Sequence, residues 1–227
     1  MPKLTIQTLC KEAATFSASQ STTPEKSLFG VTDGKAVGTF LEHKFRDYLK
    51  GRYEFQVGSS ANGIDFPDLL VDMKVTSIKQ PQSSCPFKSA RQKVYGLGYS
   101  LLVFVYDKVD DARKKTATLN ILHTIFVEAE RTADHQTTRV LRQILENDGN
   151  RDDIFAYLED SRISLDEVGR RKLADEITRN PPHQGFLTTP PVVRWQLPYS
   201  PAMERAGLEQ CVLDIQRMPE LQPRMGI

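Results

Sequence analysis

The sequence has few cysteines and no long apolar run. Its 227 residues include three cysteines, Cys10, Cys85 and Cys211, whose wide spacing and odd number exclude a disulfide framework and a metal-finger motif. Sparse, unpaired cysteines are typical of a reducing compartment. The longest apolar stretch, residues 101–106, is too short to cross a bilayer, and residues 1–16 contain no apolar run of signal-peptide length. We therefore expect a soluble, cytoplasmic protein without a membrane partner.

The sequence also lacks a nucleotide-binding fingerprint, a histidine metal motif and an excess of charge. Gly96 and Gly98 are not accompanied by the other glycines of a phosphate-binding loop, so we expect no nucleotide cofactor. The four histidines follow no metal-ligand spacing. With a formal net charge of +1, any binding of nucleic acid must depend on a local basic surface.

The apolar pattern predicts an α/β fold, in which a central mixed β-sheet is flanked by helices and a helical C-terminal portion is added. Helical spacing predicts a helix over residues 34–50, with Asp33 as its N-cap and Gly51 at its end. Residues 17–24 are expected to form a loop, and residues 81–98 a loop with a short helix. Strands are expected over residues 53–57, 64–66, 69–76, 99–106 and 117–127. The fourth is apolar throughout, as in a central strand that is buried on both faces.

Residues 65–74, DFPDLLVDMK, carry the groups that metal-assisted hydrolysis of a phosphodiester needs. Two carboxylates can hold Mg²⁺ with coordination sites left open, and a nearby lysine can orient the attacking water. Asp72 and Lys74 are two residues apart and share one face of a strand. A bend at Pro67 can bring Asp65 beside Asp72, while Asp68 is the rival for the first ligand. Such alternation also describes any half-buried strand, but aspartate is disfavoured in strands.

The pattern GIDFP followed by VDMKVTS, residues 63–67 and 71–77, resembles the PD-(D/E)XK nuclease superfamily, to which many type II restriction endonucleases belong. The spacing of its two aspartates is similar to that in the mismatch-repair nickase MutH. The resemblance implies that Asp65, Asp72 and the backbone carbonyl of Met73 bind Mg²⁺, for which Mn²⁺ substitutes. It also implies that Lys74 is the catalytic lysine and that an acidic residue of the preceding helix has a role. Glu42 is the best match for that residue, although it could equally be a solvated residue beside the apolar stripe.

The function that this resemblance implies is that of a type II restriction endonuclease. Such an enzyme hydrolyses phosphodiester bonds of double-stranded DNA at a specific short sequence and leaves a 5′-phosphate. A palindromic target would imply a homodimer, because protein symmetry then mirrors the symmetry of the site. The alternatives are a nickase, mismatch-repair or junction-resolving nuclease of the same superfamily, and a DNA-binding regulator that cuts nothing.

The stretch from residue 73 to residue 106 contains no acidic residue but five basic ones. Neutralisation of phosphates by lysine and arginine is the main source of DNA affinity that does not depend on sequence. Glutamine and serine in the same stretch could contact bases or phosphates. Charge runs are most often solvated surfaces, but this one directly follows the proposed metal site. The DNA-binding candidates are Lys79, Gln80, Gln82, Ser83, Ser84, Lys88, Arg91 and Lys93.

The periodicity after residue 128 is mainly helical. Helices are expected over residues 132–147, 151–159, 165–178 and 202–218, and a hairpin or edge strand over residues 186–197. We therefore expect residues 1–130 to form the catalytic core. Residues 131–227 would complete the fold and serve DNA binding or dimerisation. Residues 151–178 also fit a helix-turn-helix with Ser164 as the second N-cap, although plain packing explains such pairs more often.

Overall fold

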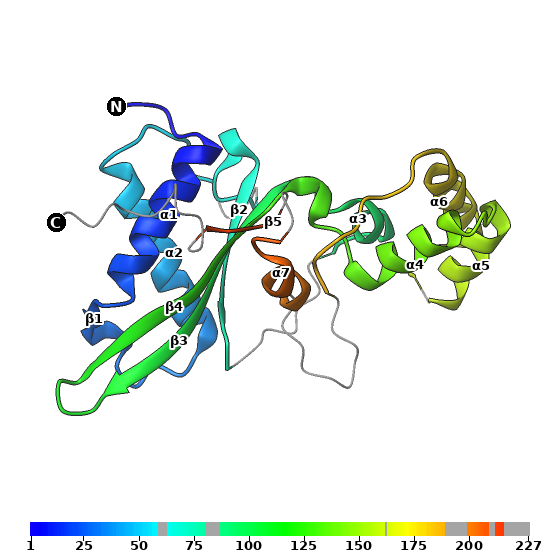
Figure 1. The fold of residues 1–227 in the computed structure, drawn as a ribbon. Helices are drawn as coiled ribbons and strands as arrows, with labels where there is room; N and C mark the ends of the chain where they lie inside the picture. The colour runs from blue at the N-terminus through cyan, green and yellow to red at the C-terminus, as the bar shows by residue number, and fades with distance from the viewer. Residues whose placement is uncertain (59–62, 80–86, 162, 189–198, 209–211, 216–227) are drawn as a thin grey trace. The chain divides into compact units, whose positions relative to one another are not determined.

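The computed structural model describes residues 1–58, 63–79, 87–161, 163–188, 199–208 and 212–215 (Figure 1). The chain divides into two compact units. The first contains Met1–Gln82, Ser100–Val127 and Met203–Ile227, and the second contains Ser83–Tyr99 and Glu128–Ala202. Among the described residues, no helix is both long and apolar enough to span a membrane.

The first unit is built on a mixed five-stranded sheet. Strand β2 (Val71–Ser77) runs parallel to β3 (Ser100–Asp111), and β3 pairs antiparallel with β4 (Thr116–Val127). The short strands β1 (Pro24–Glu25) and β5 (Val212–Asp214) both pair antiparallel with β4. The order β1-β4-β3-β2 therefore leaves β2 at one end of the sheet.

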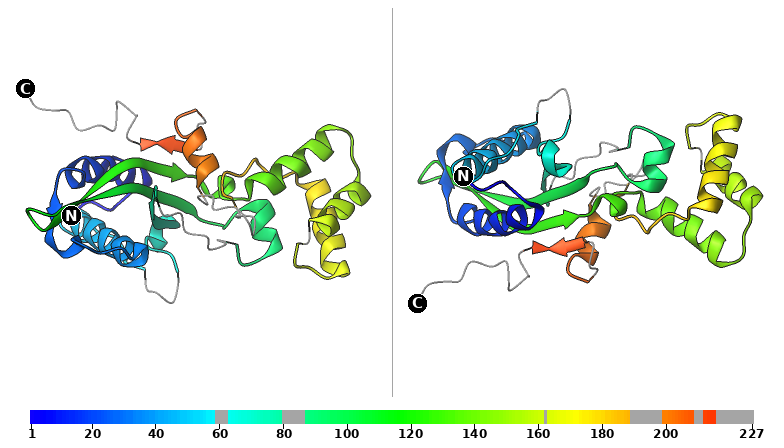
Figure 2. Two further views of the ribbon diagram at one scale, coloured as in Figure 1. Left: turned by 90° about the horizontal axis from the view of Figure 1, so that it is seen from below. Right: turned by 90° about the horizontal axis from the view of Figure 1, so that it is seen from above.

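Two long helices cover one face of this sheet. Helix α1 (Ile6–Gln20) packs against β4, and α2 (Gly34–Lys50) packs against β2 (Figures 1 and 2). The short 3-10 helices η1 (Lys26–Leu28) and η2 (Pro67–Leu69) lie in the connections. Helix α2 is therefore in place to present side chains to the edge strand.

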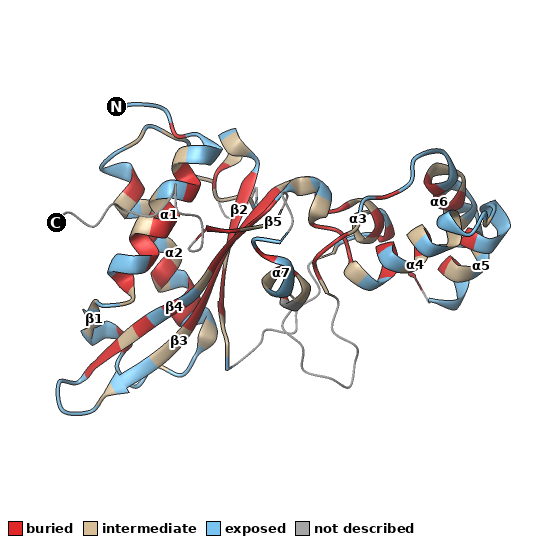
Figure 3. Cartoon of the chain, viewed as in Figure 1, coloured by how far each residue is buried: buried red, intermediate tan, exposed pale blue. Residues whose placement is uncertain are grey.

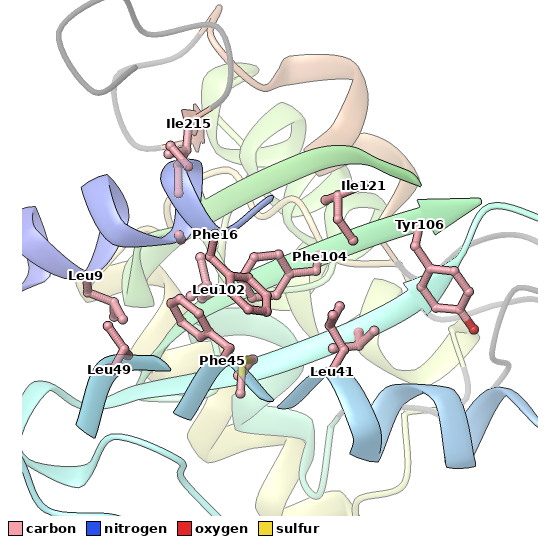
Figure 4. Close-up of a cluster of buried hydrophobic side chains, with 14 of the residues drawn as sticks. Leu9, Phe16, Leu41, Phe45, Leu49, Leu102, Phe104, Tyr106, Ile121 and Ile215 are labelled. Atoms are coloured by element: carbon pink, nitrogen blue, oxygen red, sulfur yellow. The ribbon is translucent and has the colours of Figure 1, made fainter. Parts of the chain in front are cut away.

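The core of the first unit lies between these helices and the sheet (Figure 4). The Phe45 ring of α2 packs 4.9 Å from the ring of Phe16 and 5.3 Å from that of Phe104, measured between centroids. Strand β2 contributes the alternate residues Val71 and Met73 to this core. The central strands are buried along much of their length (Figure 3), as the apolar segment 99–106 predicts.

The second unit is helical in its described part. It contains α3 (Ala90–Tyr95), η3 (Ala129–Arg131), α4 (His135–Glu146), α5 (Arg151–Asp160) and α6 (Glu167–Arg179). Helix α7 (Ser200–Arg205) falls at the boundary between the units. Buried side chains at helical spacing form a separate core, with Leu141, Ile154, Leu158, Leu173, Ala174 and Ile177 among its members.

The predicted α/β class is confirmed, and several elements agree closely with the prediction. Helix α2 begins at Gly34 after the N-cap Asp33, whose side chain accepts from the Lys35 N–H, and it ends before Gly51. The helices of the second unit begin and end within a few residues of the predicted bounds. The helical portion also takes residues 83–99 from the expected core and leaves residues 203–227 to the sheet unit. DNA binding or dimerisation by this portion stays a prediction.

Other predicted elements were wrong because tertiary contacts outweigh local pattern. Residues 53–57 and 64–66 form only isolated bridges, Glu54 with Lys3 and Phe66 with Val71. The strand predicted from residue 69 begins at Val71, because Pro67–Leu69 forms η2.

Three further predictions were wrong, two near the ends of the chain and one at a helix cap. Helix α1, which was not predicted, extends into the predicted loop 17–24, where buried Ser17 hydrogen-bonds Thr124 at 2.7 Å. The helix predicted over residues 202–218 ends at Arg205, and Gly207 with φ +77° precedes a strand instead. The N-cap of α6 is Asp166, not Ser164. The hairpin predicted over 186–197 lies largely outside the described residues.

Replacing Phe45 by alanine should lower the free energy of unfolding by about 3–5 kcal/mol. Phe45 is fully buried, so its removal leaves a cavity that the neighbouring side chains can fill only in part. Urea unfolding followed by circular dichroism measures this loss. Phe29→Ala is the control, since Phe29 is 37% exposed and should lose well under half as much. Equal losses in the two variants would contradict the placement of Phe45 at the centre of the core.

Candidate active site

A tight chain reversal before β2 positions Asp65. Helix η2 is followed by Leu70 in the left-handed region, with φ 50° and ψ 47°. Phe66 and Val71 then pair through two backbone hydrogen bonds of 2.9 and 3.2 Å. A leucine with positive φ is uncommon and costs conformational energy. The Phe66–Val71 hydrogen bonds hold the turn in spite of that cost, and the reversal places Asp65 alongside the edge strand.

The Asp65 carboxylate docks on the free edge of β2. Its Oδ2 accepts a hydrogen bond from the Met73 N–H at 2.9 Å. The backbone groups of every second residue point to β3, beginning with Leu70, whose carbonyl accepts from the Ser100 N–H at 2.8 Å. Met73 belongs to the other set, whose backbone groups point away from β3. In a strand, the N–H and C=O of one residue point to the same side, so the Met73 carbonyl also points to this edge. One carboxylate and one backbone oxygen are thus presented together.

Asp72 and Lys74 lie on the face of β2 opposite to Met73. The Lys74 Nζ is 2.7 Å from Asp72 Oδ2, and Asp72 is only 3% exposed. Burial raises the pKa of Asp72 to about 6, and Lys74 opposes this rise. A hydrogen bond with the Asp65 side chain raises the pKa further, so the two aspartates lie against one another. The carboxylates of residues 65 and 72 and the ammonium of residue 74 therefore converge.

Helix α2 adds an acid and a base to this cluster. Glu42 and Arg46 are four residues apart and therefore share one face of the helix. Burial raises the pKa of Glu42 to about 7, with Asp65 and Asp72 adding to the rise and Lys74 and Arg46 opposing it. Arg46 Nη1 lies 3.7 Å from Asp65 Oδ1. Arg46 was missed from the sequence, although its spacing from Glu42 was a usable signal.

Asp68, the rival for the first ligand, is engaged elsewhere. Its Oδ2 accepts a hydrogen bond from the Gln56 N–H at 3.1 Å. Its side chain lines a separate cavity of about 540 Å³ with Lys3, Phe55 and other residues. The structure thus brings Asp65, rather than Asp68, to Asp72.

The oxygen atoms at this edge are of the kind that a hard divalent cation prefers. Two carboxylates in mutual contact repel each other when both are ionised, and a cation between them would relieve that repulsion. Among the described residues, no three His, Cys, Asp or Glu side chains form a metal-binding group. An ion here would therefore be held by two carboxylates, the Met73 carbonyl and water. These residues fit Mg²⁺ or Mn²⁺.

The predicted DNA-binding residues are distributed over both units. Lys79, in the first unit, forms an ion pair with Asp107 at 2.6 Å. In the second unit, Arg91 donates to Glu176 Oε1 at 2.8 Å. Lys88 and Lys93 also belong to the second unit. Gln80, Gln82, Ser83 and Ser84 lie outside the described residues. DNA contact by all eight stays a prediction.

A helix-flanked mixed sheet with an acid–lysine cluster on its edge strand is the arrangement expected of a restriction-endonuclease-like protein. A family model described as "Type II restriction enzyme NspV" matches residues 3–214. The type II restriction enzyme NspV of Nostoc sp. (strain ATCC 29411 / PCC 7524) is 62% identical over 217 residues, which cover 96% of this chain and 99% of that protein. The chain therefore belongs to the NspV family of type II restriction enzymes. No solved structure matches it.

The raised pKa values predict that the metal-free protein loses stability as the pH rises. A carboxyl whose pKa is higher in the folded state binds more protons when folded, so ionisation between about pH 4 and about pH 7 disfavours the fold. Asp72→Asn removes one of these ionisations and keeps an acceptor for Lys74. In EDTA, this variant should melt at a higher temperature than the wild type at about pH 8 and differ little at about pH 5.

Differential scanning calorimetry at the two pH values measures this effect. Asp68→Asn is the matched control, because it removes an aspartate on the same segment that is bonded to the Gln56 N–H instead. It should not raise the melting temperature. An Asp72→Asn variant that is destabilised equally at both pH values would contradict the electrostatic interpretation of the cluster.

Proposed function

We propose that this chain is a magnesium-dependent endonuclease of the PD-(D/E)XK type that cuts double-stranded DNA at a specific short sequence. The observation that carries the proposal is the convergence of Asp65 and Asp72 with Lys74 at the edge of β2. Membership of the NspV family, whose curated relative is a type II restriction enzyme, supports the same function. A restriction system in the cytoplasm and a homodimer acting on a palindromic site complete the proposal.

Three oxygen donors would hold the cation: the side chains of Asp65 and Asp72 and the Met73 carbonyl. When bound, Mg²⁺ neutralises charge on the phosphate and lowers the pKa of a bound water. The Met73 N–H holds Asp65 Oδ2 in the absence of an ion. Asp65 would therefore lose little freedom on binding the cation, which would favour affinity.

Lys74 would place the attacking water. Its Nζ is anchored on Asp72 Oδ2 at 2.7 Å, yet the side chain is 43% exposed, so the ammonium lies where the buried acid meets solvent. From there it can donate a hydrogen bond to the water and to an oxygen of the scissile phosphate. The water oxygen would bond to phosphorus as the bond to the 3′ oxygen breaks, and the 3′ oxygen would take a proton from solvent water, leaving a 5′-phosphate and a 3′-hydroxyl.

Glu42 would assist the movement of the proton that the water loses. A carboxyl with a pKa of about 7 can accept and release a proton near neutral pH. Its position on α2, close enough to Asp65 and Lys74 for both to shift its pKa, would put it beside the proposed ion. This supports a catalytic role over that of a solvated surface residue.

The charges of the second unit favour the nuclease over a DNA-binding regulator. A helix-turn-helix formed by α5 and α6 would need cations that are available to phosphates. Arg170 and Arg171 instead form ion pairs with Glu159 and Glu167, at 3.6 and 2.8 Å. These pairs engage two of the basic side chains that the regulator would use.

Incubation of phage DNA with the protein tests the proposal. Discrete fragments should form with Mg²⁺ or Mn²⁺ and none with EDTA, and sequencing of the fragment ends gives the site. Asp65→Asn, Asp72→Asn and Lys74→Met should each lower the cleavage rate by at least about a hundredfold.

Asp68→Asn is the matched control and should cut as the wild type does, since its side chain is bonded to Gln56 rather than to the cluster. Mismatched and four-way junction substrates distinguish the other nucleases of the superfamily. Cleavage that persists in EDTA, or undiminished cleavage by Asp72→Asn, would refute the proposed site.

A further inference from the structure

Arg46 is a mostly buried arginine whose position is fixed but whose hydrogen-bond donors are not used. Its side chain is 17% exposed, and Nη1 lies 3.7 Å from Asp65 Oδ1. That distance allows charge attraction but exceeds the length of a hydrogen bond. The ion pair therefore orients the guanidinium toward Asp65 without occupying an N–H.

Several other arginines among the described residues use their donors. Arg52 donates to the Tyr48 carbonyl at 2.9 Å, and Arg91 donates twice to Glu176, at 3.1 and 2.8 Å. Arg46 makes no hydrogen bond within the described part of the chain, although buried donors are normally satisfied. The Nε of Arg170 is buried without a hydrogen-bond partner, but no nitrogen of Arg46 is in that situation. The donors of Arg46 thus remain accessible beside Asp65.

The charges around Arg46 define what these donors can bind. The site brings together the acids Glu42, Asp65 and Asp72, while Lys74 is held on Asp72 at 2.7 Å. Arg46 is then the second cation of the cluster. A guanidinium presents its N–H groups as a rigid fork that matches two oxygens of a phosphate. The DNA backbone offers that group to any residue beside the ligands of the proposed ion.

We propose that Arg46 binds a phosphate of the cleaved DNA strand, with Asp65 holding the guanidinium in orientation. This inference rests on the proposed function and adds a substrate-binding residue to it. Helix α2 would then supply Glu42 for the proton and Arg46 for the phosphate from a single face. The edge strand would supply the ligands of the ion and Lys74.

The salt dependence of DNA binding tests this role. Binding of a short duplex that contains the cleavage site is measured by fluorescence anisotropy with Ca²⁺, from about 50 to about 200 mM KCl, with gels to verify that the duplex stays intact. Each phosphate that a protein neutralises contributes about 0.9 to the slope of log Kd against log salt. Arg46→Met should lower that slope by about 0.9 and weaken binding at low salt by about tenfold. Arg46→Lys should keep the slope.

Lys50→Met is the matched control, because it removes one charge from the same helix at an exposed residue paired with Asp47. Its slope should equal that of the wild type, and thermal melting in EDTA verifies that each variant is folded. A wild-type slope in folded Arg46→Met, or an equal decrease in Lys50→Met, would overturn the inference. If the wild type still cuts DNA, either of these results would overturn only the role of Arg46 and leave the proposed function intact. A wild type that neither binds nor cuts DNA would refute the proposed function itself.

Discussion

The repulsion between Asp65 and Asp72 is the constraint around which this part of the structure is arranged. Two carboxylates in contact, one of them 3% exposed, are unfavourable unless a proton or a cation lies between them. The fold nevertheless forces the contact through a left-handed leucine and a hydrogen bond from the Met73 N–H. A structure selected for stability alone would relax both features. The cation of the proposed function would offset this cost.

The charges around these aspartates explain why the apo protein tolerates the contact. Lys74 neutralises Asp72 from the same strand, and Arg46 faces Asp65 from α2. With Glu42 included, the cluster contains three acidic and two basic side chains, so its net charge is close to zero before any ion binds. A divalent cation then makes it positive, which suits the approach of a phosphate. Under the proposed function, the same residues would serve folding without the ion and substrate binding with it.

Local pattern was sufficient to predict the elements that carry the site, but not the elements that surround it. Helix α2 has an apolar stripe, an N-cap and a terminal glycine, and each agrees with the fold. The alternation at Asp72 and Lys74 likewise defined their shared face. Helix α1 was missed although Thr5 caps it and its buried residues recur at helical spacing; only its continuation through Ser17 depends on a distant residue, Thr124, more than a hundred positions away.

The choice between Asp65 and Asp68 shows why spacing alone left the first ligand open. Both residues precede β2 within a few positions, and either could reach Asp72 by some path. The backbone decides between them, since the pairing of Phe66 with Val71 sets Asp65 opposite the Met73 N–H. Asp68, within the turn itself, is directed to Gln56. A leucine with positive φ leaves no signature in sequence, because nothing in its chemistry distinguishes it from other leucines.

The distribution of paired charges indicates how recognition and cleavage could be divided between the two units. Many basic residues of the second unit are balanced internally, as Arg142 is by Glu146 and Arg91 by Glu176. Lys88 and Lys93 form no ion pair within the described residues, and their contact with phosphates stays a prediction. Affinity that comes from many weak phosphate contacts could therefore be spread over the chain, whereas the proposed chemistry would depend on a few residues whose positions the edge of β2 fixes.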